Sequence, residues 1–299
     1  MPAESRVISV VIAARNCRAD AVACLASLSS EVDAHCELVV ACTSDDSLCE
    51  VVARDFGWAR LVRCAPGSGL GAIRARGLAG TTGSVVVFLD PYCRVPPGWL
   101  ARWRDQPWDQ FAAVGGLVEP VPRAHLAEWA AFLSEYAPHL APMPAGEATT
   151  LTGNNVAFKR AALEQAGLIG TPEFWKTFAV WALRAGGERC WTDPRQIVRH
   201  VRATRLGEFT RDRYWHGRSF GATRTSGRGW ALRLARAASC PAVPFVLTAR
   251  LVRDVHSRRN MRRLLWQSLP FAVLFNVAWA VGELDGYLRG SGPASSRLA

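Results

Sequence analysis

The chain has 299 residues, of which 49% are hydrophobic and 20% charged, and its formal net charge is +11. This length suits one large α/β domain with an appendage or two modest domains, and the composition is that of a folded protein. The charge favours anionic partners such as nucleotide diphosphates or lipid headgroups, whereas no recognition helix, aromatic RNA-binding motif or zinc-finger spacing points to nucleic acid. Nine cysteines without a Cys-x-x-Cys pair, and no recognisable signal peptide, predict reduced thiols in a cytoplasmic domain.

Short apolar segments alternate with single helices over the first 90 residues. Strands are expected at residues 7–13, 38–42, 59–64 and 85–89, with helices between them. This alternation predicts a parallel sheet covered by helices on both faces. Because ligands of such sheets bind beyond the carboxyl ends of the strands, Ala14, residues 42–46 and Asp90 are expected to line one crevice.

The pattern changes after Pro91. An edge strand is expected at residues 114–121, a helix at 123–136, a strand at 154–158, a helix at 173–185 and short extended segments at 188–191 and 197–200. The proline-rich residues 138–150 have little periodicity, and such a loop is a candidate lid. The sequence therefore predicts a first domain over residues 1–205.

The remaining residues, 206–299, form a basic and apolar C-terminal region. Residues 209–224 are an amphipathic stretch rich in arginine and aromatic residues, and two apolar segments follow at 237–252 and 264–282 with five arginines between them. The second segment is near the roughly 17–25 residues of a spanning helix, but Pro270 interrupts it. A re-entrant or interfacial hairpin, with its arginines against anionic headgroups of the cytoplasmic leaflet, fits these lengths. The alternative is that both segments pack on the first domain.

Several motifs follow one another along the first 200 residues. They are SVVIAARN at 9–16, a helix at 69–77 that carries Arg74, VVVFLD ending at Asp90 with PGWL at 97–100, LTGNNVAFKR at 151–160, and Glu173 at the head of a helix. In this order they resemble the family 2 glycosyltransferases, whose acceptor-side segment reads G-x-N-x-A-F-x-R. The resemblance implies an α/β fold of GT-A type, a Rossmann-like sheet that binds a nucleotide sugar, followed here by a helical, membrane-associated C-terminal region.

The resemblance also implies roles for individual residues. The expected nucleotide-sugar-binding residues are Ala14, Asn16, Cys42, Asp45, Arg74 and Asp90, and the expected acceptor-side residues are Gly153, Asn154 and Asn155. Asp90 and His200 would bind a divalent metal, Mg²⁺ or Mn²⁺, that neutralises the leaving diphosphate. Glu173 would act as general base on the acceptor hydroxyl, with Asp90 on the other side of the crevice.

Some positions of the family motifs hold other residues in this chain. The D-x-D motif reads Asp90-Pro91-Tyr92, the acidic pair reads Glu173-Phe174, and an expected aspartate pair reads Ala41-Cys42. The expected activity is transfer of a sugar, of the hexosyltransferase type, from a nucleotide-sugar donor to a lipid-linked or secondary-metabolite acceptor at the cytoplasmic face of the cell membrane. The alternative is a catalytically impaired protein of the same fold that acts as a binding or scaffolding subunit.

Overall fold

The structure is a computed structural model that describes residues 6–256 and 258–292. Contacts between residues divide the chain into two compact units. The sheet unit comprises Met1–Val121 and His139–Arg202, and the helical unit comprises Pro122–Pro138 and Ala203–Ala299. Residues 122–138 thus belong to the helical unit, although they lie within the first domain expected from the sequence. The division into domains 1–205 and 206–299 stays a prediction.

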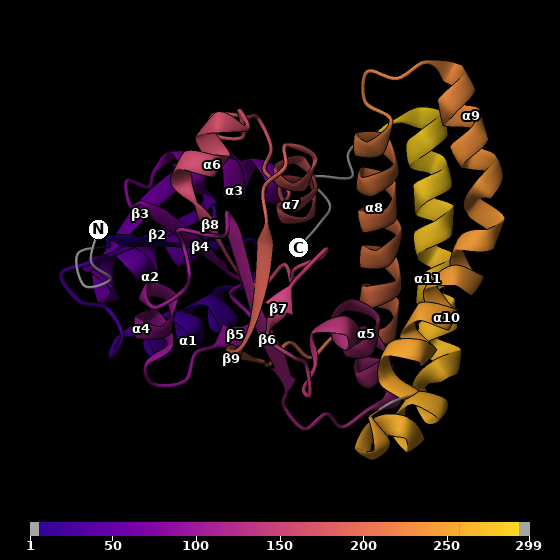
Figure 1. Cartoon of the computed structure of the whole chain (residues 1–299), viewed down its shortest axis with the longest axis horizontal. Coiled ribbons are helices and arrows are strands. Elements are labelled where there is room, and N and C mark those ends of the chain that lie inside the picture. Colours follow the sequence, from indigo (N-terminus) through magenta and orange to yellow (C-terminus); the bar gives the residue numbers. More distant parts are fainter. Residues whose placement is uncertain (1–5, 257, 293–299) are drawn as a thin grey trace. The chain divides into compact units, whose positions relative to one another are not determined.

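Over the described residues, the sheet unit contains one sheet of nine strands, in the order β3-β2-β1-β4-β8-β6-β9-β5 with β7 paired to β9 (Figure 1). The strands are β1 Ile8–Ala13, β2 Cys36–Thr43, β3 Ala59–Cys64, β4 Val85–Leu89, β5 Cys93–Arg94, β6 Ala113–Pro120, β7 Gly146–Glu147, β8 Asn155–Lys159 and β9 Cys190–His200. Strands β1 to β4 pair in parallel, whereas β8 is antiparallel to both β4 and β6. The predicted α/β class is confirmed, and the sheet is mixed.

Helices flank this sheet and complete its core. They are α1 Arg18–Leu28, α2 Leu48–Asp55, α3 Leu70–Ala79, α4 Trp99–Arg104, α6 Arg160–Gln165 and α7 Lys176–Ala185. Strand β1 is buried along its whole length, as is β4. A strand covered on both faces needs apolar side chains at every position, which explains why these two segments read as unbroken apolar runs.

The second half of the sheet differs from the sequence-based expectations. Strand β6 was expected at an edge, but it lies between β8 and β9. The two short segments expected at 188–191 and 197–200 are parts of the single strand β9, whose pairing with β6 is irregular between Gly115 and Leu117. At this irregularity a Cβ on Gly116 would lie 1.9 Å from the carbonyl oxygen of Gln196, so only glycine allows the two backbones to approach this closely.

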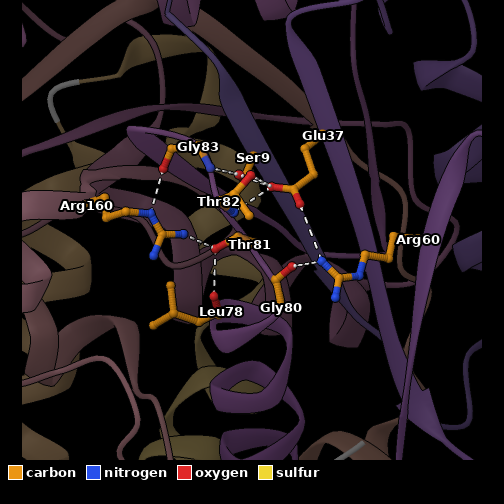
Figure 2. A network of polar contacts seen from close by, with 9 residues as sticks. All are labelled: Ser9, Glu37, Arg60, Leu78, Gly80, Thr81, Thr82, Gly83 and Arg160. Carbon is orange, nitrogen blue, oxygen red and sulfur yellow. Dashed lines mark hydrogen bonds and ion pairs between the residues drawn. The ribbon is translucent and has the colours of Figure 1, made fainter.

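A polar network fixes the loop that leads into β4, at the amino end of the strand (Figure 2). The Glu37 carboxylate accepts hydrogen bonds from Ser9 Oγ at 2.6 Å and from the backbone N–H of Thr82 at 2.7 Å. From the other side, Arg160 donates through Nε to the carbonyl oxygen of Gly83 at 2.7 Å and through Nη2 to the hydroxyl oxygen of Thr81. Arg160 is the arginine of the LTGNNVAFKR motif, and its hydrogen bonds join the start of α6 to the loop before β4. The network fixes the position at which β4 begins. Because β4 has five residues, the same network also fixes the position of Asp90, the residue that follows the strand.

The helical unit consists of α5 Leu126–Tyr136, α8 Leu206–Arg224, α9 Trp230–Ser239, α10 Val243–His256 and α11 Arg262–Arg289, which pack side by side (Figure 1). Four glycines allow α8 and α11 to pack backbone against backbone. A Cβ on Gly217 would lie 2.2 Å from the carbonyl oxygen of Trp279, and one on Gly282 would lie 2.0 Å from that of Tyr214. Gly221 and Gly286 make the same kind of approach one turn later. Such small-xxx-small pairs are typical of closely packed helices.

Charged pairs and exposed apolar side chains both occur in this unit. Arg218 of α8 lies 3.0 Å from Asp285 of α11, and Arg224 lies 3.3 Å from Glu283. Of the helices in the described part of the chain, one segment, Arg259–Arg289, is long and apolar enough to cross a membrane by length and composition, with a mean hydropathy of 1.5. The predicted apolar C-terminal helix is therefore confirmed, and its membrane association stays a prediction.

Candidate functional site

The candidate site lies at the carboxyl end of β4. Asp90 is the residue that follows this strand, and its backbone is held on both sides: its N–H donates to the carbonyl oxygen of Asn154 at 3.3 Å, and its own carbonyl oxygen accepts from the N–H of Cys93 at 3.0 Å. The side chain of Asp90 is 24% exposed. A carboxylate in a fixed position at the end of a parallel strand is thus open to a ligand.

Two cationic side chains approach the Asp90 carboxylate. Lys176, the first residue of α7, places its Nζ 2.6 Å from Asp90 Oδ1. Arg74, in the middle of α3, places a guanidinium nitrogen 3.7 Å from the same oxygen. The Lys176 and Arg74 side chains are 6% and 11% exposed. One carboxylate therefore faces two nearly buried cations, and the group carries a net positive charge.

Burial and the neighbouring charges together shift the pKa values of Asp90 and Lys176. Burial acts to raise the pKa of Asp90, but Lys176 and Arg74 outweigh it and hold the pKa below the usual value. Burial, together with the neighbouring charge of Arg74, lowers the pKa of Lys176 to about 8. Asp90 is therefore a carboxylate at neutral pH, and Lys176 is still mostly an ammonium.

Core packing determines the position of Lys176. Two residues before it, Phe174 stacks on Phe88 of β4 at 4.8 Å between ring centroids, and its N–H donates to the carbonyl oxygen of Gly71. The ring of Trp175 lies against Gly71, where a Cβ would come within 3.0 Å of it, and Arg74 lies over the same ring at 5.7 Å. Phe174, which stands at the second position of the acidic pair, is thus a core residue that anchors the start of α7.

Glu173 lies in the loop before α7, because the helix begins at Lys176 and not at residue 173 as expected. Its side chain is half-buried, and its Oε2 accepts a hydrogen bond from the indole nitrogen of Trp175 at 2.9 Å. The residue is therefore held on the same short segment as Lys176. The role of Glu173 as a base stays a prediction.

Two of the three expected acceptor-side residues lie beside this group. A Cβ on Gly153 would lie 3.6 Å from Lys176 Cε, and the Asn154 carbonyl oxygen binds the Asp90 N–H. Asn155, by contrast, is fully buried, and its amide is used inside the protein: it accepts from Trp99 Nε1 at 3.2 Å and donates to the carbonyl oxygen of Gln196 at 2.9 Å. Asn155 thus ties β8 to β9.

The ends of β1 and β2 carry the other expected nucleotide-binding residues. Ala14 and Cys42 are fully buried, and Asp45 is exposed. The adjacent carboxylate of Asp46 joins the two strand ends, since it accepts from the backbone N–H of Asn16 at 3.2 Å and from that of Leu48 at 2.9 Å. Asn16 has a φ of 52°, a left-handed conformation that asparagine tolerates better than most residues. Asp46 lies within the residues 42–46 expected to line the crevice, and its carboxylate links the ends of β1 and β2.

Asp90 and His200 were the expected metal ligands. His200 ends β9, pairs with Cys93 of β5, is 5% exposed and acts electrostatically on Asp90. Among residues 6–256 and 258–292 no group of three or more His, Cys, Asp or Glu side chains could hold a metal ion. Mg²⁺ in nucleotide sites is held by one or two carboxylates together with water and phosphate oxygens, but the Asp90 carboxylate is bound by Lys176 at 2.6 Å and faced by Arg74 at 3.7 Å. A carboxylate paired with two cations does not fit a divalent cation.

Comparison with known proteins identifies the family. The sequence matches the family described as glycosyl transferase family 2 over residues 9–165, more than half of the chain. This chain belongs to that family. A search of curated proteins returned no match for this glycosyltransferase family member. Among solved structures it is similar to the mannosyltransferase PcManGT from Pyrobaculum calidifontis in complex with GDP-Man and Mn²⁺, at 18% identity and a TM-score of 0.56, over 93% of this chain and 87% of that chain. At this identity the likeness establishes the fold, that of a GT-A glycosyltransferase.

Sequence reasoning about this family 2 glycosyltransferase missed Lys176. Its signal was present, because Lys159 and Lys176 are the only lysines in a chain with 36 basic residues. In a chain where nearly all other basic residues are arginine, a lysine is a candidate for a role that arginine cannot fill. One such role is a compact point charge in a buried position.

Proposed function

We propose that this protein transfers a sugar from a nucleotide-diphosphate donor to a lipid-linked or secondary-metabolite acceptor at the cytoplasmic face of the cell membrane. The observation that carries the proposal is the positively charged group of Asp90, Lys176 and Arg74 at the carboxyl end of β4. Fixed cations at that edge of an α/β sheet suit a diphosphate. Membership of glycosyl transferase family 2 supports a nucleotide sugar as the donor.

Glu173, Lys176 and Arg74 would each take part in the transfer of the sugar. In a single displacement, the acceptor hydroxyl loses its proton to the Glu173 carboxylate while its oxygen forms a bond to the anomeric carbon of the sugar. The bond between that carbon and the β-phosphate oxygen breaks, and its electron pair stays on the diphosphate. Lys176 and Arg74 stabilise the negative charge that develops there. The hydrogen bond from Trp175 fixes the orientation of the Glu173 carboxylate.

A membrane surface as partner is supported by the helical unit. Several large apolar side chains on α9 to α11 are exposed, among them Phe245 at 77%, Trp230 at 59% and Trp266 at 53%. In the sequence, Arg258, Arg259, Arg262 and Arg263 lie between α10 and the apolar part of α11. Aromatic and arginine side chains in such a mixture favour the headgroup region of an anionic leaflet. Because Asp285 and Glu283 of α11 are paired with arginines of α8, we place this unit in the interface and not across the bilayer.

A binding or scaffolding subunit is the second candidate, and the residues at positions 92 and 174 favour it. Tyr92 replaces one motif carboxylate, and Phe174, which replaces another, is part of the core. Both candidate functions imply the same fold and the binding of a nucleotide. Only the glycosyltransferase would turn over the donor sugar.

The test is donor turnover by the purified full chain with a panel of UDP- and GDP-sugars and a lipid extract as acceptor, measured as nucleoside diphosphate released and labelled sugar in the lipid fraction. Glu173→Gln is expected to lower kcat by about 10²- to 10⁴-fold without weakening donor binding. Glu188→Gln, which removes an exposed acid just beyond α7, is the matched control and should leave kcat unchanged. Nucleotide binding without turnover would favour the scaffolding subunit, and absence of any nucleotide affinity would refute the donor chemistry.

A further inference from the structure

The Lys176 ammonium contacts Asp90, the carboxylate of the D-x-D motif that this chain retains, and the second acidic position of the motif is Tyr92. We propose, on the basis of the donor chemistry above, that Lys176 and Arg74 bind the donor diphosphate in place of a divalent cation, so that nucleotide binding needs no metal. Asp90 then acts as a positioning residue: its carboxylate orients the ammonium toward the ligand and does not coordinate an ion.

The distance between Asp90 and Lys176 supports an ammonium in place of a metal ion at this carboxylate. Nζ lies 2.6 Å from Asp90 Oδ1, and protein oxygens coordinate Mg²⁺ at about 2.1 Å and Ca²⁺ at about 2.3–2.6 Å. An ammonium at this distance occupies one of the lone-pair positions of Oδ1, and its charge repels a divalent ion from the rest of the same carboxylate. A divalent ion that took the place of the ammonium would have to displace the lysine.

Displacement of Lys176 is opposed by its packing. The lysine is 6% exposed and starts α7, the helix whose approach is fixed by Phe174 in the core. Arg74 reaches the same carboxylate from α3 and is itself nearly buried. A divalent cation entering here would meet two fixed positive charges and one carboxylate, an arrangement that repels cations and attracts anions.

A further hydrogen-bond donor lies on Asn154, the residue whose backbone binds Asp90. Asn154 is 1% exposed, and its Oδ1 accepts from Thr152 Oγ1 at 2.6 Å, which directs the amide group away from Thr152. Its Nδ2 atom is buried and has no hydrogen-bond partner in the part of the chain that the structure describes. A buried N–H donor without a partner costs free energy unless a ligand accepts from it. The backbone carbonyl oxygen of Asn154 binds the Asp90 N–H, so the residue that carries this donor is adjacent to Asp90.

The experiment is titration calorimetry of the purified full chain with GDP and with UDP, each in EDTA and each in Mn²⁺. We expect the affinity of the better nucleotide to agree in the two conditions within about twofold. Lys176→Met should weaken that affinity about 10- to 100-fold in EDTA, the loss typical of a charge-assisted hydrogen bond. Lys159→Met is the matched control, because it removes the same charge from the other lysine of the sheet unit and should leave affinity unchanged. Circular dichroism of both variants checks that they are folded.

The outcomes separate this inference from the proposed function. Binding that appears only with Mn²⁺, or a Lys176→Met variant that binds as tightly as the wild type, would overturn the inference while the donor chemistry stands. Absence of binding to either nucleotide in either condition would remove the donor chemistry itself, and the inference with it. Equal binding in EDTA and Mn²⁺ together with a loss specific to Lys176→Met supports both.

Discussion

Replacement of Gly217 by alanine tests the close packing of α8 on α11. The added Cβ would lie 2.2 Å from the carbonyl oxygen of Trp279 and 3.1 Å from the backbone nitrogen of Glu283, both in α11. These are backbone atoms of a helix, so relief requires the two helices to separate by about 1 Å, and overpacking of this kind costs about 1–3 kcal/mol. We expect Gly217→Ala to lower the thermal midpoint of the helical unit by about 5 °C or more.

The same helix provides the control. Gly207 lies in the first turn of α8, and a Cβ there would meet nothing within 4 Å. Gly207→Ala should therefore stabilise the protein by about 0.4–1 kcal/mol, because alanine restricts the unfolded chain and favours the helix. Thermal unfolding of both full-length variants, followed by circular dichroism in detergent, gives the comparison. A midpoint for Gly217→Ala equal to that of Gly207→Ala would show that α8 and α11 do not approach as described.

Two further predictions concern the membrane and acid stability. A variant with serine at Trp230, Leu234 and Phe245, which are 59%, 55% and 77% exposed, should bind vesicles of anionic lipid about tenfold more weakly than wild type in a sedimentation assay; unchanged binding would exclude this apolar surface as the contact. Asp193 is buried, and although burial acts to raise its pKa, hydrogen bonds from Arg195 and Gln106 hold the pKa below its usual value. Its folded-state pKa is depressed, so its contribution to stability is present above the unfolded value of about 4 and is lost as the pH falls through the folded value. Asp193→Asn should therefore cost about 1–2 kcal/mol in urea unfolding at pH 7, and the difference from wild type should shrink below about pH 4; a difference independent of pH would refute this account.

The parallel half of the sheet could be predicted because its signals are local. Strands β1 to β4 are short and largely apolar, the first three are each followed by a helix, and all four overlap the ranges predicted from the sequence. Asp90 and Arg74 were also found in this way, since one ends a strand and the other lies on a helix of a recognisable motif. Their approach to 3.7 Å follows from the parallel order of the strands, which brings such residues to one edge.

The antiparallel half of the sheet and the position of Lys176 depend on contacts that the local sequence pattern does not encode. Strand β6 reads as an edge strand in sequence, yet its two neighbours, β8 and β9, are contributed by later segments. Asn155 was expected to meet the acceptor, but its amide bonds to Gln196, which lies 41 residues away. Lys176 meets Asp90 across 86 residues, and only the anchoring of Phe174 in the core brings the two together. Contacts between residues so far apart in the chain cannot be predicted from a single sequence. The sequence therefore predicted the place of the site but not its net positive charge.

Three residues determine the charge that this site offers. Tyr92 stands at the second acidic position of the D-x-D motif, Phe174 stands at the second position of the acidic pair, and Lys176 supplies a positive charge two residues after Phe174. Taken singly, the first two replacements indicate loss of activity. Taken with Lys176, they agree with our proposal that this site binds an anion without a metal ion. Phe174 packs on Phe88 in the core two residues before Lys176, so the residue at the position of the missing acid also helps to hold the cation against Asp90, where the carboxylate orients the ammonium.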